Sequence, residues 1–140
     1  MSLKYLLDTN IISEAKRLLP NENVIKNIKL YSQEIATASV VISELLFGIL
    51  RLSISKKRED LEDYLYNVIL VNIPILGYDL RPAQYHAQER VRLSKIGKTP
   101  AFADGQIASI AFSNDLILVT NNVKDFADFA DLEIDNWFEG

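Results

Sequence analysis

The sequence contains no cysteine and a single histidine, His86. The lack of cysteine excludes a disulfide framework, a thiolate zinc site and a cysteine nucleophile. A single histidine excludes a multi-histidine metal centre. No run of about 18 uncharged apolar residues is present, so we expect no transmembrane helix. The N-terminal residues reach Asp8 after two leucines, which is unlike a signal peptide, and we therefore expect a cytoplasmic protein.

The composition that remains is typical of a globular protein. The chain has 140 residues, of which 49% are hydrophobic and 24% are charged. This length suits one domain and is short for two, so the sequence predicts a single domain over residues 1–140. The net charge of -4 argues against a nucleic-acid-binding surface that is basic over the whole chain.

The charge is unevenly distributed along the chain. Residues 81–98 carry five bases and one acid, whereas residues 115–140 carry seven acids and one base, Lys124. A local basic segment binds a polyanion even when the total charge is negative. A solvated helix face is the more common explanation of any one charge run. The candidate bases are Arg81, Arg90, Arg92, Lys95 and Lys98.

Short apolar segments alternate with longer segments of helical spacing. Buried strands are expected at residues 3–7 and 116–119, with weaker candidates at 35–37 and 71–75. This alternation predicts an α/β fold with a mainly parallel sheet covered on both faces. Helices are expected over 24–31, 39–52, 61–69, 81–96 and 101–112, with loops at 78–79 and 97–100.

Three acidic residues stand in places that need an explanation. Asp8 ends the first strand, and ligands of parallel sheets bind beyond the carboxyl ends of strands. The alternative is that Asp8, Thr9 or Asn10 caps a helix that begins near Ile11. Glu44 and Asp104 lie in apolar segments, VVISELLFGIL and PAFADGQIASIA, that predict buried helices.

A buried carboxylate is costly unless a cation or strong donors replace its water. For Glu44 the alternatives are a protonated side chain or a distant arginine, and for Asp104 an interaction with the helix dipole. Further oxygen donors follow the strand at 116–119, where a polar turn is the alternative; these are Thr120, Asn121, Asn122 and Asp125.

Together these residues predict oxygen ligands after two strands and on two helices. Neighbouring carboxylates repel one another and raise each other's pKa, a cost that a hard divalent cation removes. Ligand sets made only of oxygen favour Mg²⁺ or Mn²⁺ over Zn²⁺, and a phosphate ester is the usual substrate of such a site.

Five motifs resemble the PIN-domain ribonucleases, and in particular the VapC-type toxins of bacterial type II toxin–antitoxin pairs. They occur in the family's order and near its usual spacing between residues 6 and 138. The motifs are LLDTNIISE, SELLFG, DGQIASIA, LVTNNVKDF and DNWF.

The resemblance implies a three-layer α/β/α PIN-like domain with a central, mainly parallel sheet. It implies an acidic pocket in which Asp8, Glu44 and Asp104 bind Mg²⁺ or Mn²⁺. Thr120 matches the hydroxyl residue that orients this site. Asn122 occupies the position of the fourth acid of many members, so the chain departs there from the family pattern. We count Thr120 and Asn122 with the three acids as catalytic residues.

The implied activity is metal-assisted hydrolysis of RNA, transfer RNA being a common target in the family. The implied partners are a cognate antitoxin, which occupies a groove and reaches the acidic pocket with an arginine, and a second copy in a homodimer. Because Asn122 lacks a charge, a degenerate PIN-like module that binds RNA or a protein without cleavage is the alternative.

Two other phosphoryl-transfer classes are disfavoured. A haloacid-dehalogenase-type phosphatase needs an aspartate where Asn10 stands, and residues 71–75 offer no acceptor for a response-regulator receiver.

Other side chains are interpreted as packing. His86 is expected to pack or to lie at the surface, because the family's site needs no histidine. Tyrosines on helices more often pack than stack on bases; these are Tyr64, Tyr66 and Tyr85. For six apolar residues we expect core packing by default, and the alternative is that they line a partner groove or a dimer face. These residues are Ile11, Ile12, Leu45, Leu46, Phe47 and Leu50.

Overall fold

The computed structural model describes residues 2–139 and is built on a parallel sheet of five strands in the order β3-β2-β1-β4-β5. All four strand pairs are parallel. The strands are β1 (Tyr5–Leu7), β2 (Ile35–Ala38), β3 (Ile75–Leu76), β4 (Ile117–Val119) and β5 (Ile134–Asp135).

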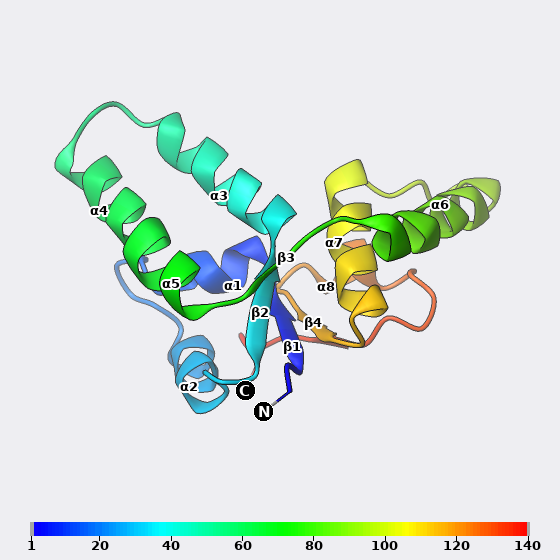
Figure 1. Cartoon of the computed structure of the whole chain (residues 1–140), viewed down its shortest axis with the longest axis horizontal. Coiled ribbons are helices and arrows are strands. Elements are labelled where there is room, and N and C mark those ends of the chain that lie inside the picture. The colour runs from blue at the N-terminus through cyan, green and yellow to red at the C-terminus, as the bar shows by residue number, and fades with distance from the viewer. Residues whose placement is uncertain (1, 140) are drawn as a thin grey trace.

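Helices cover both faces of the sheet, which confirms the three-layer α/β/α architecture. They are α1 (Thr9–Glu14), α2 (Glu22–Leu30), α3 (Ser39–Leu50), α4 (Lys56–Tyr64), the π-helical segment η1 (Leu65–Ile69), α5 (Leu70–Asn72), α6 (Leu80–Lys95), α7 (Phe102–Ser113) and α8 (Val123–Phe126). Figure 1 shows α1, α2, α4 and α5 on one side of the strands and α6, α7 and α8 on the other. Within residues 2–139 no helix is both long enough and apolar enough to span a membrane.

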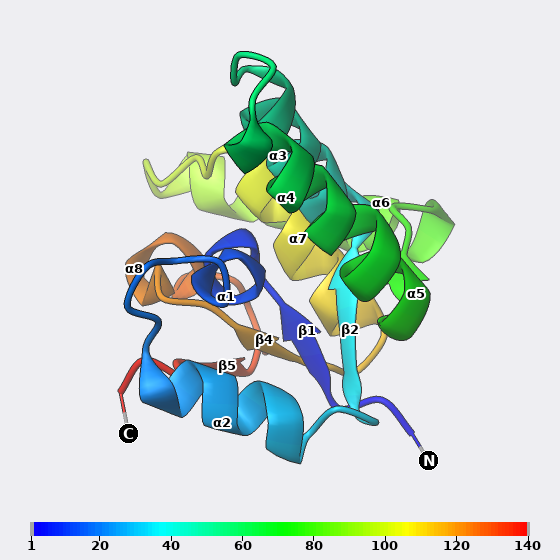
Figure 2. The ribbon, with the colours of Figure 1, turned by 90° about the vertical axis from the view of Figure 1, so that its left-hand side faces the viewer.

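The strand order creates a crevice at the carboxyl ends of β1 and β4. The chain runs from β1 outward through β2 to β3, then returns to place β4 on the other side of β1 (Figure 2). Ligands of open parallel sheets bind where the strand order reverses in this way. Asp8 and Thr120 follow β1 and β4 directly and therefore lie at this point.

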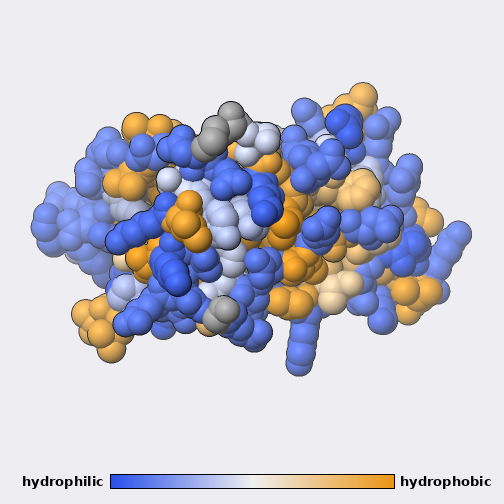
Figure 3. Space-filling model, turned by 90° about the horizontal axis from the view of Figure 1, so that it is seen from below, coloured by the Kyte–Doolittle hydropathy of each residue, from blue (hydrophilic) through white to orange (hydrophobic). Residues whose placement is uncertain are grey.

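The core is a single cluster around the central strands. Leu6, Leu7 and Leu118 are fully buried in it. The end of the chain is held to β1 by aromatic contacts, with the ring centroid of Tyr5 at 4.9 Å from Tyr31 and 5.1 Å from Trp137. At the amino ends of the strands the surface is mainly hydrophilic, with apolar side chains scattered among polar ones (Figure 3).

The third strand differs from the expectation. Residues 71–75 were expected to form it, but α5 continues to Asn72 and the strand begins at Ile75. Pro74 explains the boundary, because a residue before proline is disfavoured in the helical conformation. Ile73 accordingly adopts extended angles, and the carbonyl of Pro74 accepts a hydrogen bond from Thr37 N at 3.0 Å.

The prediction that α3 is buried on all sides was wrong. Only Val41 and Ile49 of this helix are buried, whereas Phe47 and Leu50 are 64% and 56% exposed. The helix packs one side on α1, α4 and α7 and leaves the other uncovered within residues 2–139. Its apolar sequence therefore reflects an exposed apolar face and not a fully enclosed helix.

Candidate active site

Asp8 is buried at the carboxyl end of β1 and has both carboxylate oxygens engaged. Oδ1 accepts a hydrogen bond from Thr9 N at 2.8 Å, which makes Asp8 the N-cap of α1, as the alternative interpretation expected. Oδ2 accepts from the hydroxyl of Thr120 at 2.8 Å. Burial raises the pKa of Asp8 against the opposing effect of these donors. Capping thus fixes the carboxylate at the crevice and does not turn it away from Thr120.

Glu44 lies on the exposed side of α3, so the expectation of a buried carboxylate there was wrong. Its Oε1 accepts a hydrogen bond from the hydroxyl of Thr9 at 3.0 Å. Thr9 therefore joins Glu44 to the same turn that Asp8 caps. From the sequence Thr9 was expected only as a possible helix cap, and its adjacency to Asp8 in the LDTN motif was the signal available.

Asp104 occupies the first turn of α7 and is influenced by the other acids. Its pKa is raised to about 6 by burial first, and then by the charges of Asp125, Asp8 and Glu44. The charge of Asp125 also contributes to the raised pKa of Asp8. The three acids named from the sequence are therefore gathered in one region, and Asp125 of α8 belongs to the same group.

Thr120 and Asn122 connect β4 to this acidic group. Thr120 is fully buried; its hydroxyl donates to Asp8 and accepts from the backbone N–H of Asn122 at 3.0 Å. Asn122 itself is exposed at the start of α8. The threonine hydroxyl thus sets the position of the turn relative to the Asp8 carboxylate.

The salt-bridge alternative finds no support in the part of the chain that the structure describes. The ion pairs there involve Glu14, Asp60, Glu62, Glu89 and Asp128, and none reaches Asp8, Glu44 or Asp104. The mutual repulsion of the candidate acids is therefore not relieved by an arginine or lysine of residues 2–139.

The acids are near one another without forming a closed cage. Over residues 2–139 no three aspartate, glutamate or histidine side chains are placed closely enough to hold a metal ion. The donors present are carboxylate, hydroxyl and amide oxygens, the ligand chemistry of hard divalent cations.

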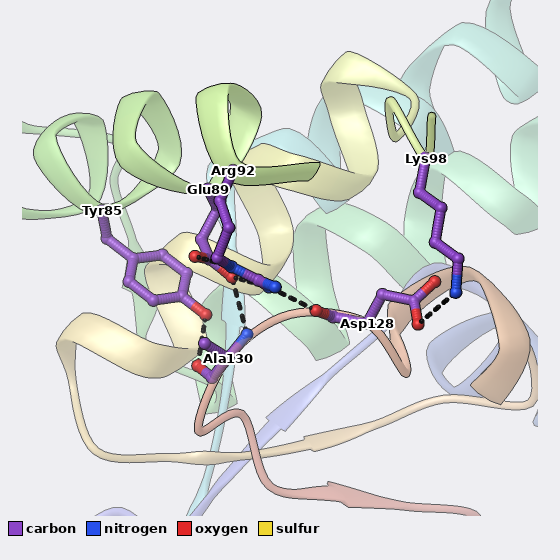
Figure 4. Close-up of polar contacts among 6 residues, drawn as sticks. All are labelled: Tyr85, Glu89, Arg92, Lys98, Asp128 and Ala130. Atoms are coloured by element: carbon purple, nitrogen blue, oxygen red, sulfur yellow. Dashed lines mark hydrogen bonds and ion pairs between the residues drawn. The ribbon is translucent and has the colours of Figure 1, made fainter. Parts of the chain in front are cut away.

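Part of the basic segment on α6 serves the fold. The Arg92 guanidinium bonds both oxygens of buried Glu89, at 2.9 Å from Nε and 2.8 Å from Nη2, and holds the pKa of that carboxyl below its usual range. Figure 4 shows Arg92 also reaching the carbonyl of Asp128, while Tyr85 donates to Ala130. Lys98 pairs with Asp128 at 3.4 Å.

The remaining bases of the segment are exposed. Arg81, Arg90 and Lys95 make no ion pair within residues 2–139, and the guanidinium of Arg90 lies 5.1 Å from the ring centroid of Phe102. Half-buried Tyr64 packs as expected and donates to the carbonyl of Ile12 at 2.8 Å, whereas Tyr66 is exposed.

His86 is a buried packing residue beside the site. Its Nδ1 lies 2.7 Å from the hydroxyl of Tyr78, and its Nε2 has no hydrogen-bond partner among the described residues. Burial lowers the pKa of His86, with a smaller contribution from Arg90. The ring lies against Gly105, the neighbour of Asp104, and so controls the approach of α6 to α7.

With this geometry established, comparison with known proteins identifies relatives along most of the chain. Residues 5–132 match the model of the PIN domain family. The chain is 33% identical over 135 residues to ribonuclease VapC2 of Rickettsia felis, covering 95% of this chain and 97% of the relative. It is 30% identical over 137 residues to the tRNA(fMet)-specific endonuclease VapC of Shigella flexneri, covering 96% and 98%.

The fold is shared with solved structures. The crystal structure of FitAcB from Neisseria gonorrhoeae matches with a TM-score of 0.89 and 32% identity, over 97% of this chain and 99% of the other. The strand order, the acids at the carboxyl edge and the extent of the sequence match agree with one another. The chain belongs to the PIN domain family, among its VapC-type toxins.

Proposed function

We propose that the protein is a metal-dependent endoribonuclease that acts as the toxin of a toxin–antitoxin pair. The observation that carries the proposal is that Thr9 bonds both Asp8 and Glu44 at the carboxyl end of β1, where the charges of Asp8, Glu44 and Asp125 also act on Asp104. Relatives named ribonuclease and tRNA endonuclease along nearly the whole chain support the choice of RNA as substrate.

We propose that Asp8, Glu44 and Asp104 would hold a cation, Mg²⁺ or Mn²⁺, with one or two of the carboxylates binding it directly and the rest acting through its bound waters. The donors fit such an ion because Mg²⁺ keeps several waters and needs only one or two carboxylates directly. When bound, the ion supplies a lowered pKa for water and neutralises charge that develops on the phosphoryl oxygens.

The side chains of this protein perform the remaining tasks. Thr120 keeps Asp8 in place by donating to Oδ2, and Thr9 does the same for Glu44. One of the carboxylates of Asp8, Glu44 and Asp104 would take the proton from the attacking water. Asn122 offers an amide in place of the usual fourth acid.

The test is cleavage of transfer RNA and of unrelated RNAs by the purified chain, with Mg²⁺, with Mn²⁺ and with a chelator. We expect cleavage only with a metal ion, and at least about a tenfold loss of rate in Glu44→Gln. Because Glu44 is exposed and accepts only from Thr9 within residues 2–139, this variant should keep the melting temperature of the wild type.

Glu59→Gln, on the exposed face of α4, is the matched control and should cleave at the wild-type rate. Equal cleavage with and without chelator would contradict metal dependence. If no RNA is cut under any condition, the non-catalytic alternative is favoured instead.

A groove beside Glu44 fits the antitoxin that we propose as partner. It has a volume of about 270 Å³ and lies between α1, α3 and α4. Apolar side chains such as Leu45, Leu61 and Tyr64 line it, together with Glu44 and Lys16. An apolar segment of the antitoxin would fill the groove, and one arginine on that segment would pair with the carboxylates of the acidic site.

Filling the groove should separate antitoxin binding from catalysis. A Cβ added at Gly48 meets nothing within 4 Å and Gly48 lines the groove, so we expect the fold to accept Gly48→Arg and the new side chain to occupy the groove. We expect at least about a tenfold loss of affinity for the co-expressed cognate antitoxin, measured by calorimetry, with RNA cleavage retained. Unchanged affinity would place the antitoxin elsewhere.

The homodimer and the cytoplasmic location expected from the sequence stay predictions. For the dimer, the exposed side of α3 offers Phe47 and Leu50, with Ile54 90% exposed in the turn that follows.

A further inference from the structure

A second, polar pocket adjoins the acidic group at the carboxyl ends of β4 and β5. It has a volume of about 400 Å³, within the range of small-molecule sites. Its lining is mainly polar and includes three amides, one base and two acids: Asn121, Asn122, Asn136, Lys124, Asp125 and Glu139. Asp125 belongs also to the acidic group, so the two sites share a wall.

The position of this pocket relative to the acids is fixed by hydrogen bonds. The hydroxyl of Thr120 donates to Asp8 and accepts from Asn122 N, which ties the pocket wall to a candidate metal ligand. Asn121 N donates to the side chain of Asn10 in α1 at 3.1 Å. The pocket is therefore held in register with the site where the phosphodiester would be cut.

The free donors and acceptors of the pocket suit a nucleobase. Asn136 Nδ2 donates to Asn121 Oδ1 at 3.3 Å, which orients that amide and leaves Asn121 Nδ2 without a partner inside residues 2–139. The side chain of Asn122 also forms no hydrogen bond there. Asparagine amides pair with the adjacent donor and acceptor of a base edge, and single-stranded RNA presents such edges unpaired.

Lys124 supplies the positive charge that this end of the chain otherwise lacks. It is the one base among the seven acids of residues 115–140, it is exposed, and it makes no ion pair within residues 2–139. An RNA entering an acidic site is repelled by the carboxylates, so a cation on the rim of the pocket favours its phosphate.

We propose that this amide pocket binds one nucleotide of the RNA substrate next to the cleaved bond. Asn121 reads the edge of the base and Lys124 contacts its phosphate. The inference rests on the proposed ribonuclease function and adds to it a determinant of sequence preference.

The experiment measures kcat and KM on short RNAs of equal length in which the bases flanking the cleavage site are varied or removed. We expect Asn121→Ala to raise KM about tenfold, to change kcat by less than about threefold and to reduce the preference among bases at one flanking position. Lys124→Gln should raise KM. It should also reduce the slope of the logarithm of the binding constant against the logarithm of the salt concentration by about the share of one phosphate contact.

Matched controls are Asn67→Ala in η1 and Lys57→Gln in α4, two exposed positions that do not line the pocket. Binding of the same RNAs to these variants in a Glu44→Gln background, followed by fluorescence anisotropy, separates recognition from chemistry. Melting curves confirm that each variant is folded.

The outcomes distinguish the two proposals. If the wild type cleaves RNA but Asn121→Ala keeps its KM and base preference, the pocket does not read a base and the ribonuclease function stands. The same conclusion follows if RNA without the flanking base is cut equally well. If the wild type neither cuts nor binds RNA, both proposals fail.

Discussion

Replacing Asp104 by asparagine is expected to reduce RNA cleavage at least about a hundredfold while leaving the fold intact or more stable. The activity falls because the variant loses a charge that would hold the cation and a carboxylate that could accept a proton. Single-turnover cleavage at saturating Mg²⁺ measures this loss, and thermal melting in chelator measures the stability.

The stability gain follows from the direction of the pKa shift. The pKa of Asp104 is raised from 3.8 to about 6, so the folded chain binds this proton more tightly than the unfolded chain. Without metal, stability therefore falls as the pH rises through this window, and at pH 7 the charge opposes folding. The neutral amide of the Asp104→Asn variant removes that cost, with a gain of about 1 kcal/mol because water reaches part of the carboxyl.

Two further measurements test whether the stability gain comes from removing the charge of Asp104 and not from a general effect of the substitution. The stability difference between wild type and Asp104→Asn should vanish below about pH 4, where the carboxyl is protonated in both folded and unfolded chains. Asp115→Asn is the matched control and should leave activity unchanged. Asp115 has a φ of 55°, which asparagine tolerates. A loss of several kcal/mol in Asp104→Asn would instead assign this residue a structural role.

The sequence predicted the proximity of Asp8 and Thr120 better than it predicted the surroundings of Glu44. Asp8 and Thr120 follow strands, and parallel strands end at one edge, so their proximity could be inferred from strand positions alone. Glu44 was expected to be buried because its helix is apolar. A sequence cannot tell an enclosed helix from one whose apolar face is left for a partner, and α3 is of the second kind.

The features that escaped prediction are short or depend on tertiary contacts. Strand β5 has two residues and helix α8 has four, which is too little for a periodic pattern. Asp125 was named from the sequence as one of several oxygen donors, but its influence on Asp104 depends on how α8 packs, and the bond from Thr9 to Glu44 joins residues 35 apart. None of these arises from local spacing.

Gly105→Ala is expected to destabilise the protein by about 3 kcal/mol, although alanine is the better helix former. A Cβ at this position would overlap the ring of His86, with Cδ2 only 2.7 Å away. The ring cannot turn aside, because Nδ1 is held by Tyr78 and the ring packs at 4.8 Å on Phe102. Helices α6 and α7 must therefore separate, which also displaces Asp104.

The same substitution at Gly48 is expected to raise the stability of the protein instead of lowering it. Gly48 lies in α3 with nothing within 4 Å of an added Cβ, so Gly48→Ala should gain up to about 1 kcal/mol from helix propensity. Chemical denaturation of both variants tests whether close packing on His86, and not helix propensity, decides the outcome at position 105.

Combining Gly105→Ala with His86→Ala tests the cause directly. Removing the imidazole makes room for the new methyl group, so the double variant should be less destabilised than the sum of the two single variants, by about 2 kcal/mol. If RNA cleavage per folded molecule also recovers in the double variant, the packing of His86 on Gly105 positions Asp104. Additive losses would mean that the two residues act independently, and the role of His86 at this site would then be limited to filling space.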